Sequence, residues 1–141
     1  MTPAIQQSAQ FACSPKQLFE MYMDSAKHTA ATGSPARISR KVGGTFTAFD
    51  GKLLGRNLLI VPDRMIVQAW RSAGWKRGDQ DSIVVLAFSK IADGSQVDLL
   101  HVDVPEHDHE GLTKGWRKFY WEPWEQYVAE KTRAKRKTAR A

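Results

Sequence analysis

The sequence predicts an α+β fold in which a curved antiparallel sheet of about seven strands wraps around one long C-terminal helix. Turn residues such as Asp50-Gly51 and Asp93-Gly94 divide residues 37–104 into short apolar runs, as in β-hairpins. Helix signals occur only before and after these runs. Residues 112–128 carry apolar and aromatic side chains over roughly 200° of a helical wheel. An arc this wide fits a helix that is enclosed by a curved surface or that partly faces a cavity.

The first segments are predicted to form one strand and two short helices. Residues 5–12 suit a strand, and Ser14-Pro15 marks a helix start, because serine caps free amides and proline needs none at the first position. Asp24-Ser25 marks a second start, and that helix should end near Gly33.

About six further strands follow, with expected ranges 37–40, 45–49, 52–61, 64–71, 82–91 and 96–104. Alternation places one set of their side chains on a common face. This set comprises Ile66, Gln68, Trp70, Val84, Leu86, Phe88, Val97, Leu99 and His101. That face needs a cover, and the C-terminal helix is the widest apolar element in the sequence.

The C-terminal helix is expected to begin near His107-Asp108, where acidic side chains favour the positive end of the helix dipole. Pro123 predicts a kink or break, because proline removes a backbone hydrogen bond. The apolar arc of this helix comprises Leu112, Trp116, Phe119, Tyr120, Trp121, Pro123, Trp124, Tyr127 and Val128.

Length and composition indicate one domain. A chain of 141 residues is long enough for one core. No run reaches the roughly 18 apolar residues of a membrane helix, and residues 1–11 lack a signal-peptide pattern, so a cytoplasmic protein without a membrane span is expected. Cys13 is the only cysteine, which excludes an internal disulfide, and it is expected to be a small buried residue rather than a nucleophile.

The net charge of +6 is confined to the C-terminus. Residues 131–141 contain six basic residues and no acid, which leaves 15 basic and 15 acidic residues in 1–130. We therefore expect a single domain over 1–130 and a basic, disordered tail over 131–141. Because the basic residues lack aromatic stacking partners, no specific nucleic-acid binding is expected.

A group of histidines and acids raises the question of a metal site or a catalytic site. The group comprises His101, Asp103, His107, Asp108 and His109. It could hold zinc, but its spacing matches no established motif, and a polar strand end leading into a helix is the simpler interpretation. We expect no metal, no cofactor and no catalytic residue. His101 is interpreted as an interior or pocket-facing histidine, and His28 as a surface residue.

The aromatic residues favour two interpretations. They could fill the core, or they could line a cavity in which a few polar groups orient an apolar guest. The predicted ligand-cavity residues are Phe46, Gln68, Trp70, His101, Trp116 and Tyr120.

A series of distinct short motifs follows one another in a defined order along the chain. They are Val42-Gly43-Gly44-Thr45-Phe46, Phe49-Asp50-Gly51, Gly55, Pro62, Ile66-Val67-Gln68-Ala69-Trp70-Arg71, Trp75, Asp93-Gly94, His101, Val104-Pro105 and Gly115-Trp116 with Tyr120-Trp121 and Pro123. From about Ile5 to Val128, the chain resembles the Aha1-type family, whose members are similar to the C-terminal domain of the activator of Hsp90 ATPase. This family lies within the START/Bet v1-like helix-grip (SRPBCC) superfamily. The resemblance implies a seven-stranded sheet around the C-terminal helix, with a cavity between them.

Three functional hypotheses follow. The leading one is a non-enzymatic domain that binds a hydrophobic, lipid-like small molecule between the sheet and the C-terminal helix. The alternative is a stress-response interaction module that contacts Hsp90 or another chaperone through surface loops, without the additional N-terminal domain of the two-domain co-chaperone. The second alternative is a hydrolase or cyclase that uses His101 with Asp103. The oligomeric state stays open between monomer and dimer.

Overall fold

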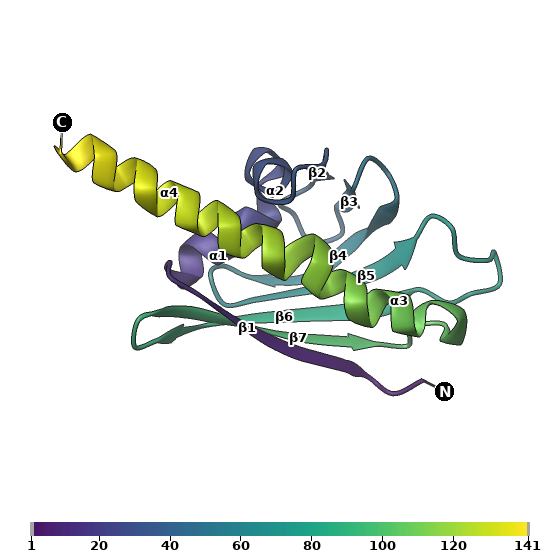
Figure 1. The fold of residues 1–141 in the computed structure, drawn as a ribbon. Helices are drawn as coiled ribbons and strands as arrows, with labels where there is room; N and C mark the ends of the chain where they lie inside the picture. The colour runs from purple at the N-terminus through teal and green to yellow at the C-terminus, as the bar shows by residue number, and fades with distance from the viewer. Residues whose placement is uncertain (1, 141) are drawn as a thin grey trace.

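The computed structural model describes residues 2–140, with side chains over 2–136. Its sheet has seven antiparallel strands in the order β1-β7-β6-β5-β4-β3-β2 (Figure 1). The strands are β1 (Ile5–Phe11), β2 (Arg37–Ile38), β3 (Thr45–Ala48), β4 (Leu53–Val61), β5 (Met65–Ser72), β6 (Ser82–Ile91) and β7 (Gly94–Val102). The helices are α1 (Pro15–Met23), α2 (Ser25–Thr32), α3 (Glu106–Trp116), η1 (Arg117–Trp121) and α4 (Glu122–Arg140). The predicted fold class is confirmed.

The short helices begin and end where the sequence predicts. The Ser14 side chain accepts a hydrogen bond from the Gln17 amide, and the Gln17 side chain accepts one from the Ser14 amide, which forms a complete capping box. Asp24 caps α2 through the Lys27 amide, and Gly33 ends α2 in the left-handed conformation.

The turn between β3 and β4 differs from the predicted two-residue hairpin. Four residues, 49–52, lie outside the ladder, because Ala48 pairs with Leu53. Phe49, Asp50 and Gly51 all have positive φ. This geometry places Phe49 next to the long helix instead of in the strand.

The long helix contains one π-helical turn, η1, between α3 and α4. The Glu122 amide donates to the Arg117 carbonyl, five residues earlier. Pro123 follows this turn and has no amide to donate, so the irregularity expected at Pro123 takes the form of a widened turn.

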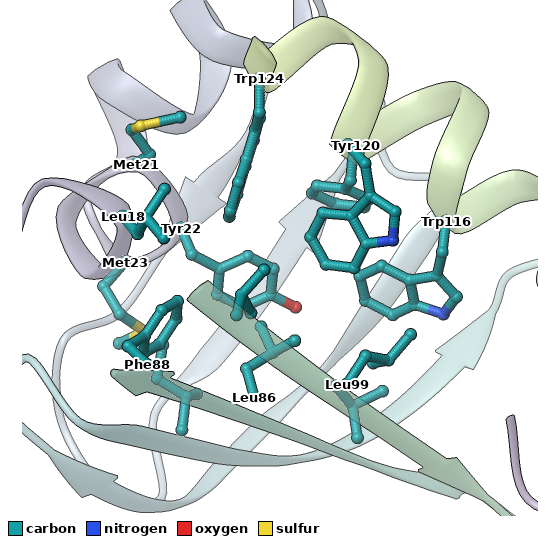
Figure 2. Packing of buried hydrophobic residues seen from close by; sticks show 14 of the residues in the cluster. Leu18, Met21, Tyr22, Met23, Leu86, Phe88, Leu99, Trp116, Tyr120 and Trp124 are labelled. Carbon is teal, nitrogen blue, oxygen red and sulfur yellow. The ribbon is translucent and has the colours of Figure 1, made fainter. Parts of the chain in front are cut away.

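Apolar side chains from the inner face of the sheet, from α1 and from the long helix form one core (Figure 2). Trp124 is 0% exposed and packs against Phe11 and Tyr22. Strand β4 approaches β5 closely at Gly55, where an added Cβ would lie 1.9 Å from the Ala69 carbonyl oxygen. Only glycine fits there, since this gap is shorter than any van der Waals contact.

The basic segment 131–141, which the sequence predicts to be a disordered tail, is described as far as Arg140, and residue 141 lies outside the described residues. α4 continues as helix to Arg140, and Figure 1 shows its end projecting beyond the sheet. Lys, Arg and Ala all have high helix propensity, so an exposed extension of an anchored helix is physically reasonable. Among the described residues, no helix is long and apolar enough to span a membrane.

Candidate functional site

An apolar cleft of about 540 Å³ opens between the long helix and the β3–β4 turn. Trp70 of β5, Trp116 of α3 and Tyr120 of η1 line it, so the structure brings together three of the six predicted cavity residues. Sequence reasoning did not assign the other apolar lining residues, which are Pro35, Phe49, Leu53, Leu112 and Phe119.

Ring contacts connect the two walls of the cleft. Phe49 lies edge-on to Phe119 and Tyr120, with centroid distances of 5.7 and 5.4 Å. Trp116 lies 4.9 Å from Tyr120 and 6.3 Å from Trp70. The Trp70 indole nitrogen is buried and has no hydrogen-bond partner among the described residues.

His101 is fully buried beneath the cleft, and its hydrogen bonds fix its protonation. The Trp116 indole donates to Nδ1 at 3.1 Å. The Ser82 hydroxyl donates to the Trp70 carbonyl, so its oxygen accepts from His101 Nε2, 2.7 Å away. Burial, with a smaller contribution from nearby His109, lowers the pKa of His101 to about 3. This neutral histidine has no free nitrogen for a substrate.

The expected pairing of His101 with Asp103 is wrong. Strand β7 ends at Val102, and Asp103 has a φ of 61°, so the alternation that would place both side chains on one face stops before Asp103. Asp103 is exposed, whereas His101 is buried. The residues of the proposed hydrolase or cyclase pair therefore lie apart.

Gln68, another predicted cavity residue, belongs to a buried chain of hydrogen bonds outside the cleft. The Tyr22 hydroxyl donates to Gln68 Oε1 at 2.7 Å, and Gln68 Nε2 donates to Asn57 Oδ1 at 3.0 Å. Asn57 in turn donates to the Ser39 and Lys41 carbonyls. Phe46, the last predicted cavity residue, is buried on β3 in the core.

His28 is buried, at 2% exposed, although the sequence placed it on the surface. Its Nδ1 donates to the Tyr22 carbonyl, so Nε2 accepts from the Tyr120 hydroxyl, 3.1 Å away. Burial lowers the pKa of His28 to about 4, and the bond to Tyr22 partly opposes that shift. The weak amphipathic pattern of α2 gave no signal for this position.

The remaining histidines and acids point to separate partners. His107 Nε2 lies 2.9 Å from Asp79, and the Trp75 indole donates to Asp108. His109 Nε2 donates to the Pro3 carbonyl. Within residues 2–136, these groups do not gather around a common point, and no set of three metal-ligating side chains is found. Their bonds anchor the β5–β6 loop and the N-terminus to α3.

A second candidate site lies on the opposite face of the sheet. Alternation along the strands directs aliphatic side chains away from the helix, and cross-strand register aligns Leu59 with Val67, Val67 with Val85 and Val85 with Leu100. We call this surface the outer-face patch. It comprises Leu59, Val61, Met65, Val67, Ile83, Val85, Ala87, Leu100 and Val102. None of these residues is fully buried, and Leu59 is 46% exposed.

Comparisons with known proteins agree with this architecture. Residues 12–129 match the family described as "Activator of Hsp90 ATPase homolog 1-like protein". An activator of 90 kDa heat shock protein ATPase homolog from Dictyostelium discoideum is 28% identical over 120 residues, covering 83% of this chain and 30% of that protein. Homolog 1 from Homo sapiens is 27% identical, covering 79% and 33%. The chain thus spans about a third of these curated relatives.

The fold is also found in a solved structure. The crystal structure of an Hsp90 activator from Plasmodium falciparum matches with a TM-score of 0.81 and 24% identity, covering 91% of this chain and 97% of that one. At this identity, the match supports the fold alone.

Proposed function

Since the chain belongs to the Activator of Hsp90 ATPase homolog 1-like family, we propose that it is a cytoplasmic interaction module that binds an Hsp90-type chaperone. The observation that carries the proposal is the outer-face patch. Uncovered aliphatic side chains in register over four strands are typical of surfaces that bind another protein.

The interior of the domain supports the same function. His101, Gln68 and His28 have their hydrogen-bonding groups used within the protein, and large side chains fill the space beneath the helix. The cleft mouth and the outer-face patch remain available to a partner as apolar surfaces.

The test measures binding of the full chain to the purified Hsp90-type chaperone of the same organism by biolayer interferometry. Leu59→Lys places a charge in the patch at an exposed position, and we expect it to weaken binding at least tenfold. Val42→Lys is the matched control, because Val42 is 62% exposed and lies outside the patch. Absence of wild-type binding removes the proposal. If Leu59→Lys binds as tightly as the wild type, the chaperone does not bind at the outer-face patch.

The cleft supports a second function, binding of an apolar small molecule against Trp70, Trp116 and Tyr120. Its volume of about 540 Å³ is within the usual range of ligand pockets. A panel of hydrophobic ligands, followed by tryptophan fluorescence, tests this function. Leu112→Trp should fill the cleft and abolish any emission shift, while Val42→Trp should leave it unchanged. No shift with the wild-type chain, or the same shift in Leu112→Trp, eliminates binding in this cleft.

A further inference from the structure

The two edges of the sheet differ in their protection against pairing. β2 has two residues, with Pro35 before it and Arg37 and Arg40 in or next to it. β1 has seven residues, IQQSAQF, which contain no charge and no proline. All seven pair with β7 in continuous register without a bulge. Proteins usually block exposed edges with charge, proline, bulges or shortness, and β1 has none of these.

The side chains of β1 are nearly symmetric about Ser8. Buried Ile5 and Phe11 lie at equal distances from it, as do exposed Gln6 and Gln10. If two copies of β1 pair antiparallel about Ser8, Gln6 of one copy faces Gln10 of the other on the outer face. A two-fold axis at Ser8 therefore places residues of the same kind opposite one another, so the edge is self-complementary, as an isologous interface requires.

The long helix carries charges that match this symmetry. A groove of about 690 Å³ lies between β1 and the helix, and its helical wall carries Lys114, Arg117 and Lys118, then Glu122 and Glu125. The Gln7 side chain donates to the Thr113 carbonyl and accepts from the Trp121 indole, so this stretch of helix lies above the middle of β1. A two-fold axis reverses its direction in the second copy, so the basic half of each helix faces the acidic half of the other.

The ion pairs within one copy do not prevent this arrangement. Lys114 pairs with Glu110 at 2.9 Å and Arg117 with Glu122 at 3.4 Å, and all four side chains are more than half exposed. Exposed pairs of this kind contribute at most about 1 kcal/mol, so their partners are exchangeable.

We propose that β1 is a homodimerisation edge, through which two copies pair antiparallel about Ser8 and extend the sheet. This interface is separate from the outer-face patch and from the cleft, so it stands or fails independently of the proposed function.

The test uses charge substitutions at the exposed positions Gln6 and Gln10, measured by sedimentation velocity over a concentration series of the full chain. We expect the wild type to sediment at twice the chain mass of 15.9 kDa. Gln6→Lys with Gln10→Lys places like charges opposite one another and should weaken association at least tenfold, as should Gln6→Glu with Gln10→Glu. An equimolar mixture of the two variants should restore the dimer, because each lysine then faces a glutamate.

Thr45→Lys with Ser89→Lys is the matched control, since both positions are exposed on strands away from β1, and it should dimerise like the wild type. A wild type that stays monomeric at all concentrations overturns the proposal. Unimpaired association of either charged variant overturns it as well. Failure of the mixture to restore the dimer excludes the register about Ser8.

Discussion

The two sides of the aromatic helix differ in how completely other elements cover them. The side that carries Trp124 is closed, because Tyr22 of α1 packs against it (Figure 2), as does Phe11 at the end of β1. The side that carries Phe119 is open, because it faces the cleft between the long helix and the β3–β4 turn, and Phe119 is 48% exposed. The same kind of side chain thus serves as core on one side and as the wall of a cleft on the other. What decides its role is the element that faces it.

Trp124→Ala is the strongest test of the closed side. Removal of a fully buried indole leaves a large cavity, and we expect the free energy of unfolding to fall by about 3–5 kcal/mol. Urea denaturation followed by circular dichroism measures this loss. A loss below about 1 kcal/mol would contradict the picture of a tightly filled closed side.

Acid should weaken both sides, because each contains a buried neutral histidine. The folded-state pKa values of His28 and His101 are lowered to about 4 and about 3, so the unfolded chain binds more protons below pH 6.5. Stability should be complete above that pH and fall by about 2 kcal/mol for each histidine between pH 7 and pH 5. Urea denaturation as a function of pH checks this. His28→Gln should remove about half of the slope, and a flat profile in the wild type would disprove the assignment.

Tyr22→Phe tests the buried series of hydrogen bonds that runs from Tyr22 through Gln68 to Asn57. The substitution leaves buried Gln68 Oε1 without its donor, and we expect a loss of about 1–2 kcal/mol in unfolding free energy. Tyr127→Phe is the control, since Tyr127 is only partly buried, and it should change stability by less than about 0.5 kcal/mol. Equal effects of the two substitutions would mean that the buried bond adds nothing.

Phe119→Ala should have the smallest effect on stability. This side chain touches Phe49 but stays half in solvent, so we expect a loss below about 1 kcal/mol in urea denaturation. The difference from Trp124→Ala measures the contrast between the two sides directly. A loss as large as that of Trp124→Ala would show that the cleft wall is part of the core.

The sequence predicted most of the fold because the relevant signals are local. Caps at Ser14 and Asp24, the glycine stop at Gly33 and the alternation along β6 and β7 act over a few residues, and each is present in the structure. The predicted turn at Asp50-Gly51 is longer than two residues, and this difference placed Phe49 in the cleft.

The candidate site was only partly predictable from the sequence. Trp70, Trp116 and Tyr120 lie in the wall of the cleft, but Gln68 and His101 are bonded to groups far away in the chain. Residue type suggested that these two polar side chains would orient a ligand in a pocket. In the structure, they instead form hydrogen bonds within the protein.

The sequence by itself determined the order of strands and helices, the family and the wide aromatic arc of the C-terminal helix, because periodicity and turn chemistry are written in neighbouring residues. Only the tertiary structure decided which part of that arc is core, which part lines a cleft and which histidines are buried. Those outcomes depend on contacts between residues far apart in the chain, such as Tyr22 with Gln68 and His28 with Tyr120, which no local pattern specifies.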